Sequence, residues 1–547
     1  MKKIFLLALI FSFCLSFGQT SNIVEPEKIE NSVQKKHLNE IMFLDKAISL
    51  ENTKETDFLK SMTFQEDKDL DIRVFQDNSL VNYLHQLNPS LPADGLLKKG
   101  NYQFTFYVDG KIIYVENLNS GAGTTESKTL KTTFRIPLIS SKNEDSWGKF
   151  LWSRFYLTKS GIDALDEGKH ILKIEIRPYL KTPTVKTGNI IAQGQINLIV
   201  QNKNIPEEQI KVQNIKPNSG WKVSNELYDT KKVRALNQKI AENRFRDITS
   251  IVVIKNGELL LEEYFNKYNR DSLNDTRSVG KSFASALTGI AIKDGYLKSD
   301  NQKISEFYDL KTFKNHASSK DNVTIKSLLT MSSAFEGNDQ DEDSPGNEEN
   351  MYPTDNWIKF TLDLPMTENK IGKNWSYFTA GAVLTGDILD QSVPKGLENY
   401  ADKKLFQPLE IKTYKWQYTP QNKVSLAGGL RMKTLDLAKF GQLYKNNGIW
   451  NGKTILDKDW IKKSFTNYFS DTPDFEGYGY LFWRKVYTIG DKSFETYQSS
   501  GNGGNKIIMF TELPIVMVIT AKAYNQPYSH SQVDKMVQEY LLPAVYK

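Results

Sequence analysis

The sequence predicts an α+β protein in which a strand-rich region precedes a region that mixes strands with helices. Residues 101–202 repeatedly alternate apolar and polar side chains, which is typical of half-buried strands. Residues 203–220 are polar, carry two prolines and have no periodicity, so we place a linker there. After the linker, a second predicted hairpin, which turns at Asn256-Gly257, is followed by a long helical pattern. A chain of 547 residues exceeds what one hydrophobic core usually supports, so two or three domains are expected.

The N-terminus has the pattern of an export signal. Lys2 and Lys3 precede an apolar run over residues 4–17, and small residues follow where a signal peptidase would cut. The run is shorter than the roughly 20 residues that cross a bilayer, and no later stretch is long enough, so no stable membrane insertion is expected. We therefore predict a signal peptide over residues 1–18 and an exported protein, periplasmic or secreted.

Composition argues against several classes of protein. Lysine and arginine number 71 against 65 aspartates and glutamates, a mild excess with no arginine-rich block and no zinc-finger spacing, so nucleic acid is not an expected partner. The single cysteine, Cys14, lies in the predicted signal. The mature chain should therefore contain no disulfide and no cysteine metal site.

The region before the linker divides into two parts. Residues 19–100 are polar with intermittent helical patterning and are predicted to form a partly helical leader region. From residue 101 the apolar period becomes two, and Asp109-Gly110 between two such runs predicts a hairpin. Residues 101–202 are predicted to form a small all-β sandwich, an accessory domain without recognisable chemistry.

The stretch RSVGKSFASALTG, residues 277–289, permits two incompatible interpretations. Its GKS could end a phosphate-binding loop, which requires a glycine five positions before the glycine of GK so that backbone N–H groups can surround phosphate. That position is Asp275, a carboxylate, which excludes the nucleotide interpretation. The remaining interpretation is a Ser-x-x-Lys pair.

Ser278 and Lys281 begin a predicted amphipathic helix that stops near Asp294-Gly295. Residues i and i+3 share a helix face, so the amine can meet the hydroxyl. The positive end of the helix favours a developing oxyanion, and a lysine in its neutral form can accept the serine proton. The alternative is that Ser278 only caps the helix while Lys281 is solvated.

Other serine-hydrolase patterns are weak in this sequence. There is no G-x-S-x-G nucleophile elbow, and only His316 and His530 of the five histidines follow the linker. A group other than histidine must therefore supply the base.

Three blocks of the sequence carry a family resemblance. SVGKSFASALTGIAIKDGYL, VTIKSLLTMSSAFEG and AGGLRMKTLDLAKFGQLYKNNGIWNGKTIL resemble the class C β-lactamase-like serine hydrolases, which include esterases, penicillin-binding proteins and 6-aminohexanoate-dimer hydrolases. The resemblance runs from about Ile248 to Lys547, with Ala334 where glycine is usual. It implies that residues 221–547 form a β-lactamase/transpeptidase-like domain, an antiparallel sheet flanked by helices with a helical subdomain.

The resemblance also implies roles in a second motif. Tyr377 matches the family's catalytic tyrosine, which would relay protons between Lys281, Ser278 and the leaving group. Thr379 stands where the family has asparagine, so it is the expected substrate contact at that position.

The third family motif, Lys/His-Thr/x-Gly, is aligned with SSGNGGNKIIMF. This alignment puts Asn502 where a cation or imidazole is usual, and Gly503 and Gly504 where the backbone approaches substrate. It implies that the N–H of Asn505 and that of Ser278 form the oxyanion hole. Without the cation, a substrate carboxylate has no natural anchor.

An acidic stretch between the motifs imitates a calcium loop. Asp339, Asp341 and Asp343 have D-x-D-x-D spacing, but position six is Ser344 and position twelve is Asn350, neither of which suits an EF-hand. We interpret the stretch as a solvated loop at the rim of the cleft, which would repel anions or attract amines. No metal site is predicted.

Together these observations predict an exported serine hydrolase that cleaves a small-molecule or short-peptide ester or amide through an acyl-enzyme, without a cofactor. Two alternatives stay open. The protein could be a penicillin-interacting D-Ala carboxypeptidase or β-lactamase, or an inactive binding module that keeps the fold despite Thr379 and Asn502.

Overall fold

The computed structural model describes residues 21–546, except 67, 143, 145, 202, 203, 471, 473 and 474. The predicted signal peptide, residues 1–18, lies outside the described residues. The chain divides into two compact units, Met1–Lys203 and Asn204–Lys547. Each unit has its own hydrophobic core.

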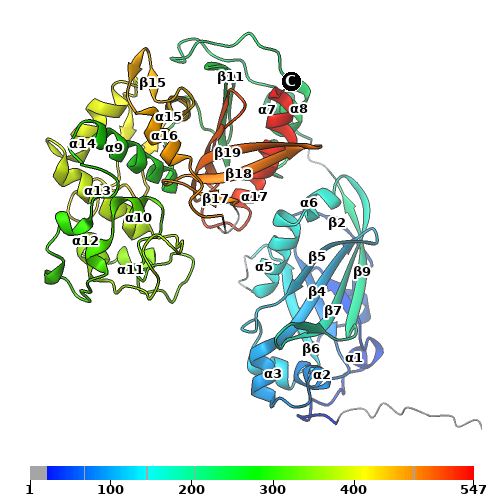
Figure 1. Ribbon diagram of the computed structural model, residues 1–547. Helices are drawn as coiled ribbons and strands as arrows, with labels where there is room; N and C mark the ends of the chain where they lie inside the picture. The colour runs from blue at the N-terminus through cyan, green and yellow to red at the C-terminus, as the bar shows by residue number, and fades with distance from the viewer. Residues whose placement is uncertain are drawn as a thin grey trace, which may run out of the picture. The chain divides into compact units, whose positions relative to one another are not determined.

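Two sheets share one core in the first unit (Figure 1, blue to cyan). The smaller sheet has the order β1-β3-β6, and the larger has the order β2-β9-β7-β4-β5 with β8 beside β7. Their bounds are β1 (Ile41–Leu44), β2 (Ser61–Phe64), β3 (Leu70–Phe75), β4 (Gly100–Val108), β5 (Lys111–Asn117), β6 (Thr133–Ile139), β7 (Gly168–Lys181), β8 (Val185–Thr187) and β9 (Ala192–Val200). Short helices accompany them: α1 (Ser32–Lys36), η1 (Glu55–Asp57), α2 (Leu80–Leu87), α3 (Ala93–Lys99), α4 (Thr125–Thr129), α5 (Trp147–Ser153), η2 (Arg154–Thr158) and α6 (Gly161–Ala164).

The predicted hairpin is confirmed, and the predicted leader region contains strands as well as the helices α1, α2 and α3. Strands β4 and β5 turn at Asp109-Gly110, where both residues have positive φ, 50° and 79°. Residues 19–100, however, supply strands β1, β2 and β3, which join both sheets. Strand β3 is buried at every position, including its polar residues Asp71 and Arg73. The leader and the predicted sandwich thus form one unit.

The second unit is built on a seven-stranded antiparallel sheet with the order β11-β10-β21-β20-β19-β18-β17. The strands are β10 (Ile248–Lys255), β11 (Glu258–Tyr264), β17 (Gly477–Tyr478), β18 (Trp483–Ile489), β19 (Lys492–Gly501), β20 (Asn505–Phe510) and β21 (Ile515–Ala521). The hairpin predicted at Asn256-Gly257 joins β10 to β11, again with positive φ at both residues. Short pairs lie outside this sheet: β12 (Asn274–Asp275), β13 (Tyr414–Lys415) and β14 (Arg431–Met432), and β15 (Ile449–Trp450) with β16 (Lys453–Thr454).

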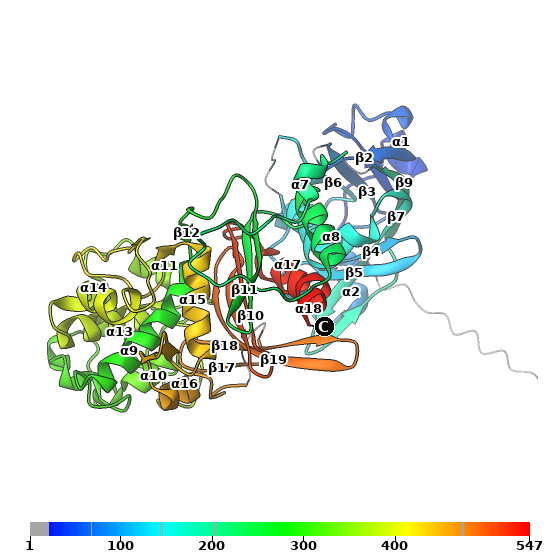
Figure 2. The ribbon, with the colours of Figure 1, turned by 90° about the horizontal axis from the view of Figure 1, so that it is seen from above.

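Helices cover both faces of this sheet, as Figure 2 shows. One face packs against helices from the two ends of the unit: α8 (Thr230–Ala241), α17 (Ser529–Lys535), η8 (Met536–Leu541) and α18 (Leu542–Val545). The other face packs against α15 (Thr434–Lys445) and the helical subdomain. The remaining helical segments are α7 (Glu207–Ile210), η3 (Arg277–Gly280), α9 (Lys281–Lys293), η4 (Ile304–Glu306), η5 (Leu310–Thr312), η6 (Lys320–Asn322), α10 (Ile325–Leu329), α11 (Glu348–Met351), α12 (Trp357–Asp363), α13 (Thr379–Ser392), α14 (Gly396–Ala401), η7 (Asp402–Phe406) and α16 (Lys458–Ser464).

The predicted fold class is confirmed, with one difference in its central helix. Helix α9 was expected to be amphipathic, but every residue from Lys281 to Ala291 is buried. The helix lies inside the core that joins α15 to the helical subdomain, so it needs no solvent-facing side. Ser278 and Lys281 therefore lie at the entrance of a buried helix.

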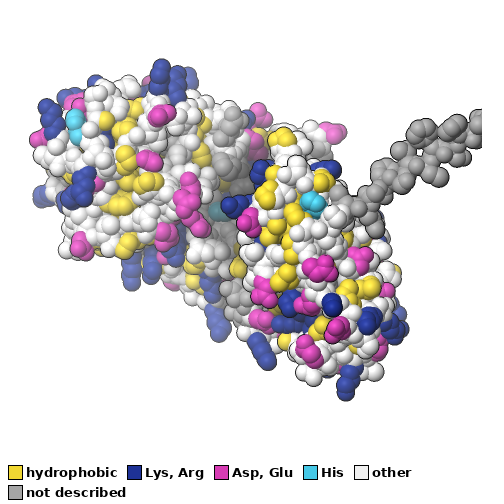
Figure 3. Space-filling model, turned by 90° about the horizontal axis from the view of Figure 1, so that it is seen from below, with side chains coloured by type: hydrophobic (Ala, Val, Ile, Leu, Met, Phe, Trp, Pro, Cys, Tyr) yellow, Lys and Arg dark blue, Asp and Glu magenta, His cyan; other side chains and the backbone are white. Residues whose placement is uncertain are grey.

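Two surface features bear on partners. Across the described part of the chain, no helix is long and apolar enough to cross a membrane. On the face in Figure 3, Lys and Arg side chains are spread among Asp and Glu side chains rather than gathered in one block. This distribution agrees with the mild net charge of +6.

Candidate active site

Ser278 lies in a strained turn that leads into α9. The residue before it, Arg277, has φ of 49°, in the left-handed region that costs a non-glycine residue about 1–2 kcal/mol. The Arg277 guanidinium lies 4.4 Å from the centre of the Tyr524 ring and 3.6 Å from a carboxylate oxygen of Asp275. These contacts hold the turn in a conformation that leaves the Ser278 side chain partly exposed at the end of the helix.

Lys281 is buried and is directed at Ser278. Lys281 is only 2% exposed. Its Nζ donates hydrogen bonds to Ser278 Oγ at 2.9 Å and to the Ala427 carbonyl at 2.5 Å. The same Nζ lies 5.2 Å from the centre of the Tyr377 ring, within the range of a cation–π contact. The alternative of a solvated Lys281 is therefore wrong.

Two glycines let the backbone close around the nucleophile turn. A Cβ at Gly501 would come within 2.3 Å of the Thr276 carbonyl and 3.1 Å of Ser278 N. A Cβ at Gly428, which lies in the loop before β14, would come within 3.0 Å of the Arg277 carbonyl. Such approaches require the absence of a side chain. Sequence reasoning missed Gly428, because only the tertiary structure brings it beside Ser278.

The third motif aligns differently from the prediction. A Cβ at Gly504 would meet the Ser529 carbonyl at 2.6 Å, so this glycine packs against α17, whereas Gly501 is the glycine beside Ser278. The cation position of the motif, two residues before the glycine, therefore falls on Ser499 rather than Asn502. The Ser499 hydroxyl is buried and has no hydrogen-bond partner among the described residues.

Asn502 and Asn505 instead stabilise the turn between β19 and β20. The Asn502 side chain donates to Asn525 Oδ1 at 2.5 Å and accepts from Asn525 N at 2.9 Å. Asn505 is buried, donates from Nδ2 to the Asn502 carbonyl at 2.9 Å and accepts from Ala521 N at 3.2 Å. Gly503 and Gly504, with φ of 89° and 93°, supply the left-handed conformations that the turn needs.

Tyr377 reaches this site from a distant part of the sequence. Its ring stacks on Trp483, with centroids 5.6 Å apart and planes at 24°, and contacts Trp375 at 6.2 Å. Within the described structure its hydroxyl makes no hydrogen bond to Ser278 or Lys281. Catalytic hydrogen bonds are often long before substrate binds, so the ring position is the relevant observation. The structure thus brings Ser278, Lys281 and Tyr377 together.

Thr379 begins α13 just beyond Tyr377. Its backbone N donates to Asp339 Oδ2 at 2.7 Å, and its hydroxyl is buried without a partner in the described residues. The hydroxyl is too well enclosed to be an exposed substrate contact in this conformation.

Asp339 is a site residue that sequence reasoning missed. Its backbone N donates to the Tyr377 carbonyl at 2.8 Å, and its carboxylate accepts from Thr379 N. Asp339 therefore forms hydrogen bonds with both ends of the segment 377–379. Burial and the nearby Glu348 carboxylate raise the pKa of Asp339 to about 6, although the Thr379 hydrogen bond and the Lys281 charge oppose this shift. The D-x-D-x-D spacing offered no signal that one of these carboxylates is buried beside Lys281.

Comparison with known proteins assigns the family. The sequence profile described as Beta-lactamase matches residues 236–538, more than half of the chain. The chain therefore belongs to the β-lactamase family, a family of serine hydrolases, as the motif resemblance predicted. The match includes Ser278, Lys281 and Tyr377.

Solved structures resemble the second unit at low identity. They include an octameric penicillin-binding protein homologue from Pyrococcus abyssi (20% identity, TM-score 0.45, covering 57% of this chain and 77% of that one). EstCE1, a hydrolase with promiscuous acyltransferase activity, has 14% identity and a TM-score of 0.46, covering 56% and 98%. A D-stereospecific amidohydrolase from Streptomyces has 13% identity and a TM-score of 0.41, covering 53% and 93%. No curated protein matches the chain. These likenesses are too remote to transfer an activity.

Proposed function

We propose that the protein is an exported hydrolase that cleaves an ester or amide bond through an acyl-enzyme on Ser278. The observation that carries this proposal is the buried Lys281 amine, which donates to Ser278 Oγ at 2.9 Å and lies 5.2 Å from the Tyr377 ring centre. The export signal, predicted over residues 1–18, supports a periplasmic or secreted location.

In the first half of the reaction, Ser278 Oγ forms a bond to the substrate carbonyl carbon while its proton passes to the Lys281–Tyr377 pair. The bond to the leaving group then breaks, and Tyr377 returns the proton to the leaving oxygen or nitrogen. In the second half, water forms a bond to the acyl carbon while its proton passes to the Lys281–Tyr377 pair. The bond between the acyl carbon and Ser278 Oγ then breaks, Oγ regains the proton, and the carboxylic acid leaves. In both halves of the reaction, Lys281 keeps the hydroxyls of Ser278 and Tyr377 within one polar cluster.

Backbone amides are the best candidates to stabilise the oxyanion. The N–H of Ser278 lies next to Gly501, so the amide that follows this glycine, that of Asn502, fits the motif better than the predicted amide of Asn505. Removing one such donor typically costs about 2.7–4 kcal/mol of transition-state stabilisation.

The substrate class follows from the third motif. The revised alignment puts Ser499, a small neutral side chain, at the position that carries a cation in the motif. A substrate carboxylate would lack its usual partner there. This supports an ester or amide without a recognised carboxylate over a penicillin or a D-Ala-D-Ala peptide.

Labelling with a fluorophosphonate probe, followed by peptide mapping, tests the proposal. We expect the probe to modify Ser278, Ser278→Ala to remain unlabelled, and the control Ser318→Ala, an exposed serine in the same unit, to label as the unsubstituted protein does. Turnover of 4-nitrophenyl acetate or butyrate should follow the same order. If neither labelling nor turnover occurs, the protein is an inactive member of the family. Labelling by a fluorescent penicillin would instead favour the carboxypeptidase or β-lactamase alternative.

A further inference from the structure

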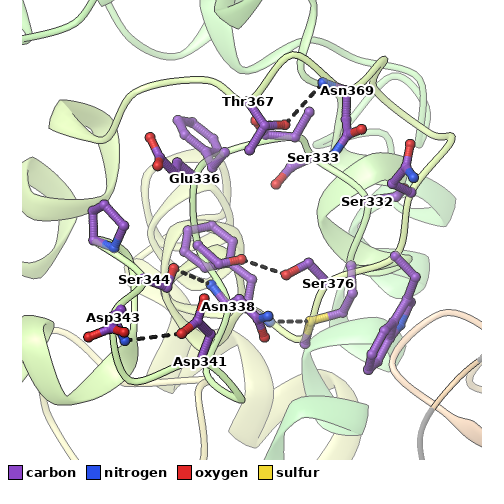
Figure 4. A pocket seen from close by; sticks show the side chains of 18 residues that line it. Ser332, Ser333, Glu336, Asn338, Asp341, Asp343, Ser344, Thr367, Asn369 and Ser376 are labelled. Carbon is purple, nitrogen blue, oxygen red and sulfur yellow. Dashed lines mark hydrogen bonds between the residues drawn. The ribbon is translucent and has the colours of Figure 1, made fainter. Parts of the chain in front are cut away.

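A polar pocket lies immediately beside Tyr377 in the helical subdomain. Its volume is about 400 Å³, and its wall is formed by residues 331–338, 341, 343–345, 367, 369, 374–376 and 378 (Figure 4). Trp375, Ser376 and Phe378 belong to its wall, and Tyr377 lies between them in the chain. The pocket is therefore one residue away from the candidate catalytic tyrosine.

The charges in this wall are all negative. Glu336, Asp341 and Asp343 contribute carboxylates, while the wall contains no lysine, arginine or histidine. None of the three carboxylates forms an ion pair with a basic side chain of the described structure. Three uncompensated carboxylates around one cavity favour a cationic occupant.

The other polar groups of the wall include hydrogen-bond acceptors as well as donors, the latter being the side-chain amides of Asn338, Asn369 and Asn374 and the Trp375 indole N–H. The Ser376 hydroxyl donates to the Gly337 carbonyl at 2.7 Å, and its oxygen lone pairs remain for a ligand. Asp341 Oδ1 accepts only a long bond from Asp343 N, at 3.1 Å. An occupant with several N–H donors can therefore bond to the carboxylates and to the Ser376 oxygen.

Ser333 gives independent evidence that the pocket receives a ligand. The residue is only 5% exposed, and its hydroxyl has no hydrogen-bond partner among the residues that the structure describes. Figure 4 shows this side chain pointing into the hollow. Because this hydroxyl faces the hollow and no hydrogen bond to the described protein occupies it, it can donate to or accept from a polar group of a ligand.

A metal ion fits this pocket less well than an organic cation. The described residues contain no group of three carboxylate, histidine or cysteine side chains that is close enough to hold an ion. Aromatic side chains also take part in the wall, from Phe335, Trp375 and Phe378, and these suit a ligand with an apolar body.

We propose that this pocket recognises the protonated primary amine of a substrate whose ester or amide bond is cleaved at Ser278. The amine donates to the carboxylates of Glu336 and Asp341 and to Ser333 Oγ, and the apolar part of the substrate lies against Trp375. This inference rests on the proposed function for its catalytic part, whereas amine binding can be measured without turnover.

Calorimetric titration of the full-length Ser278→Ala protein tests binding alone. Benzylamine, protonated at pH 7, is expected to bind at least about tenfold more tightly than benzyl alcohol, which has the same ring but no charge. The double variant Glu336→Gln, Asp341→Asn should lose this preference. The control Glu342→Gln, an exposed carboxylate of the same loop outside the pocket wall, should keep it. Equal binding of the two probes, or a preference that survives in the double variant, would overturn the proposal.

A matched pair of esters tests the link to catalysis. The protein with Ser278 intact should hydrolyse 4-nitrophenyl 4-(aminomethyl)benzoate with a kcat/KM at least about tenfold above that for 4-nitrophenyl 4-methylbenzoate, and the double variant should equalise the two. Turnover without this preference would overturn the amine site and leave the hydrolase intact. A benzylamine preference without any turnover or Ser278 labelling would instead reject the hydrolase and keep the site.

Discussion

The Asp339 carboxylate links the geometry of the site to pH. It accepts hydrogen bonds from Thr379 N at 2.7 Å and Glu348 N at 2.9 Å, and its backbone holds the Tyr377 carbonyl. Because its pKa is raised to about 6, the carboxylate is ionised above this pH and accepts both bonds. Below pH 6 it becomes protonated, one oxygen becomes a donor, and one of the two amides loses its acceptor.

We therefore expect kcat for ester hydrolysis to fall as pH decreases through about 6. In Asp339→Asn the amide can accept only one of the two bonds at any pH, so kcat should be roughly tenfold lower at pH 8 and show no transition near pH 6. Asp343→Asn, a change of the same chemistry at an exposed position nearby, should keep the transition. A transition near pH 6 that persists in Asp339→Asn would assign it to another group.

Gly501 controls the shape of the nucleophile turn. In Gly501→Ala the new Cβ would lie 2.3 Å from the Thr276 carbonyl, so the backbone before Ser278 must shift. We expect fluorophosphonate labelling of Ser278 to slow by about 100-fold, as small displacements of catalytic groups typically do. The control Gly121→Ala adds a Cβ at an ordinary contact distance of 3.4 Å and should label normally. Unchanged labelling in Gly501→Ala would show that the turn tolerates the shift.

Single residues differ in how far the sequence reveals them. Ser278 and Lys281 could be predicted as a pair, because helical spacing alone brings their side chains together, and Tyr377 followed from its motif. Asp339 and Gly428 could not, because their roles depend on contacts between segments far apart in the chain. The third motif was misaligned by three residues, since its several glycines fit the same pattern until packing distinguished Gly501 from Gly504.

At the scale of elements, the buried Lys320 connects separate loops of the helical subdomain through hydrogen bonds. Lys320 Nζ donates to the carbonyls of Leu362 at 2.9 Å, Leu364 at 2.7 Å and Lys314 at 3.3 Å. Burial lowers the pKa of Lys320. These bonds join η6 to the end of α12. The lysine lies beside Phe335, which belongs to the wall of the pocket in Figure 4.

Lys320→Met keeps the length and apolar stem of the side chain but leaves these carbonyls without their donor. We expect the free energy of unfolding of the second unit to decrease by about 3 kcal/mol, measured by urea denaturation. Lys311→Met, at an exposed position, should change it by less than about 0.5 kcal/mol. Equal stability of the two variants would mean that solvent satisfies the carbonyls.

Elements were predictable where local signals are strong. Both Asx-Gly hairpins formed at the expected residues, because Asn and Asp tolerate the positive φ that their turns require. The three strands within residues 41–75 were missed, since they are short, with four residues in β1 and β2 and six in β3. Helix α9 was found, but its complete burial depends on the layers around it.

At the scale of the whole molecule, residues near the start of the second unit cover β11, the edge strand of its sheet. Gln213 Nε2 donates to the Tyr264 carbonyl at 2.8 Å, and Tyr264 N donates to Gln213 Oε1 at 3.2 Å, which imitates a strand pairing with β11. Gln213 N and Asn237 Nδ2 both donate to the buried carboxylate of Glu263, at 2.8 and 2.9 Å. An otherwise open edge strand is thereby protected.

This carboxylate should make the stability of the protein depend on pH. Burial raises the pKa of Glu263 from 4.5 to about 7 in the folded protein. Between these values the unfolded chain is already ionised while the folded protein still binds the proton, so unfolding releases a proton. The contribution of Glu263 is therefore fully present below pH 4.5 and is lost as pH rises to 7, with a total size on the order of 3 kcal/mol.

Glu263→Gln removes this titration while its amide oxygen can still accept one of the two bonds. We expect its free energy of unfolding, relative to the unsubstituted protein, to increase between pH 5 and pH 8 in urea denaturation. Glu258→Gln, on the same strand but partly exposed and paired with Lys222, should show no such rise. A difference between Glu263→Gln and the unsubstituted protein that stays constant from pH 5 to 8 would mean that water reaches the carboxylate and keeps it ionised, so that the edge of the sheet opens more readily than its hydrogen bonds suggest.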